Sequence, residues 1–255
     1  MNTKDRLDSQ LRFILEIDKL KEIRRRSYLL NSKRRENSSE HSWHVAILAM
    51  LLGEHGNEDL DLCRVVCMVL VHDLVEIDAG DTYCYDQEGG QDKAQREIKA
   101  ADRLFGLLPT DQGQWLHGLW KEFEHGVTSE AKFANAIDRF MPLLHNFWTQ
   151  GTSWLENDIS QDQVQERMAP VQKGSQALWE YSQQIIDAAV DQGYLRPAAT
   201  DACLGSGSEP EESNRPHPHP ETDTPAAQRR PQPGPDGADG HGWRKARTGR
   251  TNGQG

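Results

Sequence analysis

Apolar residues recur at intervals of three and four through residues 1–197 and lose that spacing afterwards, which limits what the chain can fold into. The region 198–255 holds 8 of the 12 prolines and 9 of the 21 glycines, with no Ile, Val, Phe or Met. Such a segment buries too little apolar surface to offset the entropy lost on ordering. The sequence therefore predicts one folded domain over residues 1–197 and a disordered tail over residues 198–255.

The spacing within the domain has the period of an α-helix, so we expect an all-α fold. One short stretch is ambiguous, because the apolar run at residues 65–71 could also be a buried strand. The acidic cap Asp61 and the lack of other strand-like stretches favour a helix there, and no β-hairpin signal is visible. Helices are expected at about 9–25, 38–55, 60–73, 92–105, 111–124, 129–148 and 161–191.

Local signals refine several of these helices. Asn37 and Glu40 stand in the positions of a capping box at the start of the second helix, and Gly106 is expected to end the fourth. Pro142 is expected to kink the sixth helix or break it just after Asp138, because proline cannot donate the helical hydrogen bond.

Charge and composition exclude several classes of function. Residues 1–197 carry 22 Lys and Arg against 32 Asp and Glu, a net formal charge of −10. Polymeric nucleic acids and anionic membranes usually require the opposite sign, whereas a small phosphate ester needs only a local basic pocket. Residues 1–12 lack the apolar stretch of a secretory signal, and no run of about 18 apolar residues could span a bilayer. We expect a cytoplasmic protein that binds neither polymeric nucleic acid nor membranes.

The four cysteines offer no metal site. They lie at positions 63, 67, 84 and 203 and form no C-x-x-C pair and no zinc-binding spacing. Cys63 and Cys67, four residues apart on an apolar helix, are expected to be small buried side chains.

Ionisable residues interrupt three of the apolar helices. His41 lies in the first turn of the second helix, His72 and Asp73 end the most apolar helix, and Asp138 lies in the middle of the sixth. Taken singly, His41 could be an exposed first-turn residue and Asp138 could form a surface ion pair with Arg139. Burying such groups without partners is costly, so the presence of ionisable residues in three apolar helices calls for a shared explanation. A divalent metal offers that explanation, because it needs ligands from separate elements that converge on one point.

This ordered set of residues resembles the HD-domain phosphohydrolases, in the branch of bacterial 5′-deoxynucleotidases and related eukaryotic HD-domain-containing proteins. The match rests on residues 36–41 (ENSSEH), 72–81 (HDLVEIDAGD) and 134–146 (AxxxDRxxPLLxN), and it runs from about residue 11 to 193. The resemblance implies a helical bundle that holds one divalent cation, such as manganese, cobalt or another transition metal. Imidazole and carboxylate ligands do not choose sharply among these ions. The implied ligands are His41, His72, Asp73 and Asp138.

The resemblance also implies roles for three further residues. Glu76 matches a position that acts in proton transfer, and Asp81 matches another position near the nucleophile. Arg26, fifteen residues before His41, matches an arginine that binds the substrate phosphate, for which a guanidinium offers paired donors. Other readings stay open, because Glu76 could be a surface carboxylate, Asp81 a cap for Thr82, and Arg26 part of a solvated basic turn.

The sequence departs from this branch at one position. The bacterial deoxynucleotidases have an aromatic residue directly after the arginine, whereas Ser27 and then Tyr28 follow here. After Asp81, a polar loop to about residue 92 is expected to pack against little else.

The expected function is hydrolysis of the 5′-phosphate of a nucleoside monophosphate, with deoxynucleotides as the leading substrates. One alternative keeps the site but changes the substrate to another phosphate ester, such as a cyclic nucleotide, a nucleoside triphosphate or a non-nucleotide. The other alternative is a non-catalytic nucleotide-binding protein. The resemblance also implies a homodimer.

Overall fold

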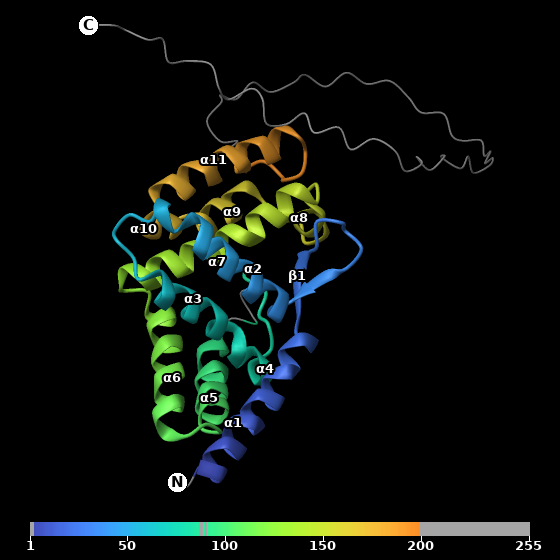
Figure 1. Cartoon of the computed structure of the whole chain (residues 1–255). Helices are drawn as coiled ribbons and strands as arrows, with labels where there is room; N and C mark the ends of the chain where they lie inside the picture. Colours follow the sequence, from blue (N-terminus) through green and yellow to red (C-terminus); the bar gives the residue numbers. More distant parts are fainter. Residues whose placement is uncertain (1–2, 87–88, 90, 199–255) are drawn as a thin grey trace, which may run out of the picture. The chain divides into compact units, whose positions relative to one another are not determined.

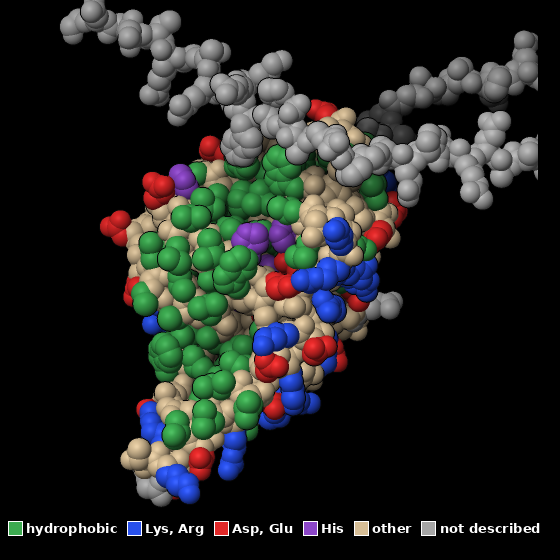
Figure 2. Space-filling view, turned by 45° about the vertical axis from the view of Figure 1, so that its right-hand side comes forward, with side chains coloured by type: hydrophobic (Ala, Val, Ile, Leu, Met, Phe, Trp, Pro, Cys, Tyr) green, Lys and Arg blue, Asp and Glu red, His purple; other side chains and the backbone are tan. Residues whose placement is uncertain are grey.

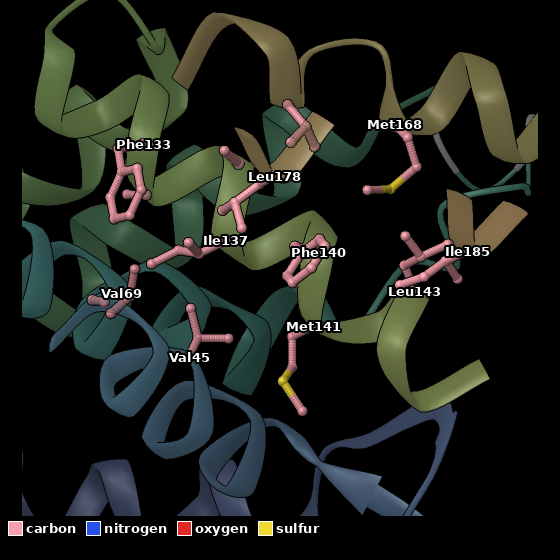
Figure 3. Packing of buried hydrophobic residues seen from close by; sticks show 14 of the residues in the cluster. Val45, Val69, Phe133, Ile137, Phe140, Met141, Leu143, Met168, Leu178 and Ile185 are labelled. Atoms are coloured by element: carbon pink, nitrogen blue, oxygen red, sulfur yellow. The ribbon is translucent and has the colours of Figure 1, made fainter. Parts of the chain in front are cut away.

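The longest helix, α7 (Ser129–Trp148), lies at the centre of the domain (Figure 1). The computed structural model describes residues 3–86, 89 and 91–198. The buried side chains of α7 include Phe133, Ile137 and Phe140, which meet apolar side chains from several other helices (Figure 3). The helices packed against α7 are α2 (Ser38–Leu52), α3 (Leu62–Val71), α6 (Thr110–His125), α10 (Val171–Gly174) and α11 (Gln176–Asp191).

Shorter elements complete the domain. Two strands, β1 (Arg24–Tyr28) and β2 (Arg35–Asn37), join the first helix to α2. The remaining elements are α1 (Thr3–Ile17), η1 (Asp18–Glu22), η2 (Gly53–His55), η3 (His72–Val75), α4 (Glu76–Ala79), α5 (Lys93–Phe105), α8 (Thr152–Glu156) and α9 (Gln161–Met168). In the part of the chain that is described, no helix combines the length and apolar character needed to cross a bilayer.

The buried apolar side chains form two clusters. The larger surrounds α7, and the smaller joins α1, α4 and α5 through residues such as Phe13, Ala101 and Phe105. The chain passes from the larger cluster to the smaller at the end of α3, since Val69 belongs to the larger cluster, whereas Leu74 and Val75 of η3 belong to the smaller. Because these two apolar side chains are buried in a close-packed cluster, η3 and the side chains it carries are held in place.

The all-α class predicted from the sequence is confirmed, and so are three of its local signals. Asn37 and Glu40 form the capping box of α2, Asp61 caps α3, and α5 ends at Gly106. The predicted tail begins at Ala198, and the rest of it, residues 199–255, lies outside the described residues. The domain boundary at residue 197 stays a prediction.

The prediction of no β-hairpin was wrong, and the helix predicted at 9–25 is confirmed only in its first part. The first helix ends at Ile17 and continues as η1, after which β1 pairs antiparallel with β2. The turn between the strands has no Asn-Gly or Asp-Gly signature. It is closed instead by the Leu29 amide, which donates to the Arg34 carbonyl at 3.0 Å, and by Ser32 at a φ of 55°.

The single helix predicted at 161–191 is three helices, α9, α10 and α11. Pro170 has no amide hydrogen to continue α9, and the Ser175 side chain caps α11 by accepting from the Leu178 amide at 3.1 Å. Of the two outcomes predicted at Pro142, the break was wrong, because α7 runs through this residue to Trp148, and the kink stays a prediction. The expected burial of Cys63 is contradicted as well, since its side chain is exposed.

The contact between α10 and α7 depends on a glycine. A Cβ at Gly174 would overlap the Lys132 carbonyl oxygen and lie 2.9 Å from the Ala136 Cβ. We expect Gly174→Ala to lower the free energy of unfolding by about 1–3 kcal/mol in urea titrations, as overpacking does. Gly118→Ala is the matched control, because its Cβ meets nothing within 4 Å and should stabilise α6 by about 1 kcal/mol. Equal effects of the two substitutions would contradict this account of the contact.

Candidate metal centre

The structure brings the four predicted metal ligands together from three parts of the chain. The His41 Nε2 atom lies 2.9 Å from Asp138 Oδ1, and the His72 Nε2 atom lies 3.0 Å from Asp73 Oδ1 and 3.4 Å from Asp138 Oδ1. Ligand atoms of His41, His72 and Asp73 all lie within 4.8 Å of one another. All four side chains are buried. The convergence of two imidazoles and two carboxylates is the donor set of a transition-metal site.

The outer atoms of the two imidazoles fit a bound cation. His72 Nδ1 lies 2.8 Å from the Val69 carbonyl oxygen, so Nδ1 donates there and the Nε2 lone pair faces the carboxylates. His72 Nε2 is buried without a hydrogen-bond partner. His41 Nδ1 lies 3.6 Å from Glu36 Oε1, an arrangement of carboxylate and histidine that is common behind metal ligands. A cation held by the two Nε2 atoms satisfies both imidazoles.

The carboxylates of the cluster are held ionised. Burial opposes ionisation of Asp73, but His72 and Arg25 lower its pKa to about 2. Burial likewise opposes ionisation of Asp138, whose pKa is held well below its ordinary value by His41 and His72. Metal ligands must be deprotonated, so both aspartates are in the form that binds a cation at neutral pH.

Glu76 and Asp81 lie beside the cluster, where sequence resemblance placed them. The Ser38 hydroxyl donates to Glu76 Oε2 at 2.6 Å, and burial together with the nearby Asp73 charge raises the pKa of Glu76 well above its ordinary value. Burial also raises the pKa of Asp81, opposed by Arg25. Asp73 lies in η3, and Glu76, three residues later, begins α4, so the continuous helical turn places Glu76 beside Asp73.

Arg25, rather than Arg26, reaches the carboxylates of the cluster. Its Nη1 atom lies 3.0 Å from Asp73 Oδ2, and 4.0 Å from both Glu76 Oε1 and Asp81 Oδ1. The exposed Arg26 lies over the Tyr83 ring, 5.7 Å from its centroid, on the wall of the same pocket. Adjacent side chains of a strand point to opposite faces. The side chains of Arg25 and Arg26 therefore point in different directions because they lie on β1, a strand that the sequence did not predict.

Glu36 and His145 are two site residues for which the sequence assigned no role. The Glu36 side chain is 1% exposed, and its Oε2 atom lies 3.5 Å from His145 Nδ1. Burial opposes ionisation of Glu36, but His145 and His41 hold its pKa far below the ordinary value. Glu36 stands in the ENSSEH motif, and His145 lies seven residues after Asp138 on the same face of α7, which is a signal available from spacing.

Because Glu36 lies behind His41, we expect Glu36→Gln to weaken metal affinity by about 10- to 100-fold, which is the usual effect of removing such a partner. Titration against a metal-binding dye measures this. The control is Glu180→Gln, the same change at an exposed position on α11. Wild-type affinity in the Glu36 variant would show that this carboxylate does not support the ligand.

Aromatic side chains line the pocket that contains the cluster. They are Phe123, Tyr83, Tyr85 and Trp154. Tyr83 and Tyr85 pack against the larger core cluster, so the expectation that the loop after Asp81 packs against little was wrong. Tyr28 does not line this pocket, because its hydroxyl donates to Glu156 Oε1 at 2.9 Å.

A family model described as HD domain matches residues 17–179 of this sequence. The chain belongs to the HD-domain family. A solved structure described as a predicted metal-dependent phosphohydrolase from Magnetospirillum magnetotacticum is 48% identical, with a TM-score of 0.73. That match covers 76% of this chain and 97% of the neighbour. The family match thus confirms the HD-domain resemblance inferred from the motifs.

Curated relatives of this HD-domain chain are similar over a shorter span. The Homo sapiens protein named 5′-deoxynucleotidase HDDC2 is 33% identical over 132 residues, which are 51% of this chain and 63% of that protein. The Dictyostelium discoideum protein of the same name is 29% identical over 161 residues, covering 60% and 84%. The matched region thus spans less than two thirds of the human relative.

Proposed function

We propose that this protein is a metal-dependent phosphohydrolase that removes the 5′-phosphate of nucleoside monophosphates, with deoxynucleotides as the leading substrates. The observation that carries the proposal is the convergence of two imidazoles and two ionised carboxylates, of which His72, Asp73 and Asp138 line a pocket with aromatic and arginine walls. The names of the human and Magnetospirillum relatives support it.

The proposed metal ligands are His41, His72, Asp73 and Asp138, which would hold one divalent cation, namely manganese, cobalt or another transition metal. Such a cation lowers the pKa of a bound water and polarises a phosphoryl group. The geometry of the donor atoms fits this role, and these ligands do not distinguish sharply among the candidate ions.

Side chains of the protein would assist the proton transfers of the reaction. Water adds to phosphorus as the bond from phosphorus to the 5′ oxygen breaks, and the leaving oxygen takes a proton, which gives a nucleoside and inorganic phosphate. Glu76, whose pKa is raised by burial and by Asp73, is the proposed proton donor. Asp81 is proposed to position the water. The assignment of Arg26 to the substrate phosphate stays a prediction, and its place on the pocket wall is compatible with it.

The experiment is phosphate release from a panel of 5′-nucleotides, ribo and deoxy, after the protein is stripped of metal and reloaded with manganese, cobalt, zinc or magnesium. The panel includes a cyclic nucleotide, a nucleoside triphosphate and a sugar phosphate. Release from deoxynucleoside monophosphates alone supports the proposal. Activity confined to another ester would overturn the proposed substrate and assign that ester instead. Nucleotide binding without turnover under any of the metals would make the protein a non-catalytic nucleotide-binding protein.

We further propose that the protein acts in the cytoplasm as a homodimer. Figure 2 shows hydrophobic side chains gathered on one face of the domain. Exposed apolar residues on α2 include Trp43, Met50 and Leu51, which are 61%, 63% and 68% exposed. Exposed apolar patches of this kind often mark protein interfaces. Light scattering should give a dimer mass for the wild type and for Leu155→Glu, but a monomer mass for Met50→Glu.

A further inference from the structure

Two aspartates of the metal cluster each have one oxygen facing the imidazoles and the other facing an arginine. Asp73 Oδ1 faces His72, whereas Asp73 Oδ2 lies 3.0 Å from Arg25. Asp138 Oδ1 faces both imidazoles, whereas Asp138 Oδ2 lies 4.0 Å from the Nη2 atom of Arg167 on α9. Each aspartate of the cluster therefore has one guanidinium group near it.

The two arginines differ in how far their charge is already compensated. Arg25 has carboxylates of Glu36, Asp73, Glu76 and Asp81 within 4.0 Å and a side chain only 14% exposed. Arg167 is 33% exposed, and Asp138 is the one carboxylate within 4.0 Å of it among the described residues. Of these two arginines, Arg167 therefore keeps more of its charge available to an incoming anion.

A second guanidinium reinforces this charge. Arg139 lines the same pocket, and its Nη1 atom donates to the side chain and the carbonyl of Asn135 at 2.8 and 3.1 Å. Its Nε atom is buried without a partner, and no carboxylate within residues 3–86, 89 and 91–198 lies within 4.0 Å of the guanidinium. Arg139 and Arg167 therefore bring two cations with few carboxylate partners to the same pocket. Like charges gathered in this way are stabilised when an anion binds near them.

We propose that Arg167, supported by Arg139, binds the non-bridging oxygens of the substrate phosphate on the Asp138 side of the cluster. The inference rests on the proposed function, since it names the phosphate contact of that same site. A phosphate placed at the four donor atoms comes within reach of Arg167, whose guanidinium is already 4.0 Å from one of the ligand side chains. The planar fork of arginine pairs with two phosphate oxygens and can neutralise charge that develops on them during hydrolysis.

The test compares Arg167→Gln with Arg196→Gln, which removes an exposed guanidinium that pairs with Asp158 outside the pocket. Three quantities are measured on metal-loaded protein: bound metal, the Kd for inorganic phosphate by calorimetry, and kcat/KM for the best nucleotide. We expect Arg167→Gln to keep its metal, to bind phosphate about 10-fold more weakly or worse, and to lose on the order of 10²-fold in kcat/KM. Arg196→Gln should match the wild type, and Arg167→Lys should fall between.

The outcomes separate this inference from the proposed function. If the wild type hydrolyses a nucleotide and Arg167→Gln matches it in phosphate affinity and kcat/KM, the assignment of Arg167 is overturned while the activity stands. If the wild type hydrolyses no ester but Arg167→Gln binds phosphate more weakly, the anion site stands and the proposed activity fails. A wild-type protein that binds no phosphate overturns the site, and loss of metal from Arg167→Gln shows that Arg167 supports Asp138 instead.

Discussion

Replacing His72 by alanine is expected to remove the bound divalent metal and to lower phosphohydrolase activity by on the order of 10³-fold or more, because metal-assisted hydrolysis depends on the cation. The His72 Nε2 atom lies within 3.4 Å of oxygens from both Asp73 and Asp138, so it links the two carboxylates of the donor set. Without it, two buried carboxylates face each other with less positive charge between them. The remaining donors then bind a cation more weakly.

Elemental analysis of the purified protein and phosphate release measure the two losses, and circular dichroism checks that the helices persist. Asp73→Asn is the second variant, since it keeps the side-chain volume while it removes the charged ligand. His125→Ala is the matched control, because this histidine is exposed at the end of α6. Retained metal and full turnover in both ligand variants would rule out the assigned centre.

Glu76→Gln is expected to keep the metal and to lower kcat by roughly 10²- to 10⁴-fold, the usual contribution of a general acid or base. Glutamine has the shape of glutamate and can still accept the hydrogen bond from the Ser38 hydroxyl, so the local geometry is preserved. It cannot give up a proton to the leaving oxygen. The loss should therefore appear in kcat rather than in metal content.

Stability separates this effect from unfolding. Burial and Asp73 raise the pKa of Glu76 in the folded protein. At pH 7, ionising this carboxyl group therefore costs more free energy in the folded protein than in the unfolded chain, which lowers the stability of the fold. A neutral glutamine removes that cost, and Glu76→Gln should unfold at no lower temperature than the wild type. Full activity in a folded, metal-bound variant would remove Glu76 from the proposed proton transfer.

The convergence of the four proposed metal ligands could be predicted from the sequence because each of them breaks a local rule. His41, His72, Asp73 and Asp138 are ionisable residues at positions where the helical period demands apolar ones, and such positions survive only with partners. Their order along the chain then matched a family pattern, which also pointed to Glu76 and Asp81.

The arginines could not be predicted in the same way, because their roles depend on element boundaries. Arg25 and Arg26 are neighbours whose orientation is set by β1, and the turn that closes this hairpin lacks the usual residues. Arg167 lies near the end of α9, and a continuous helix through Pro170 would have given this segment a different path. Glu36 and His145 meet through tertiary packing between β2 and α7, which periodicity within one helix does not report.

The 3-10 turn η3 makes the spacing from His72 to Glu76 intolerant of change in length. In such a turn each residue advances the chain by about one third of a revolution. One residue inserted between Asp73 and Glu76 would swing Glu76 by about a third of a revolution from Asp73 and shift the smaller apolar cluster with it. A deletion would turn it the other way. The interval from His72 to Glu76 therefore fixes how Glu76, the proposed proton donor, lies relative to the proposed metal ligands His72 and Asp73.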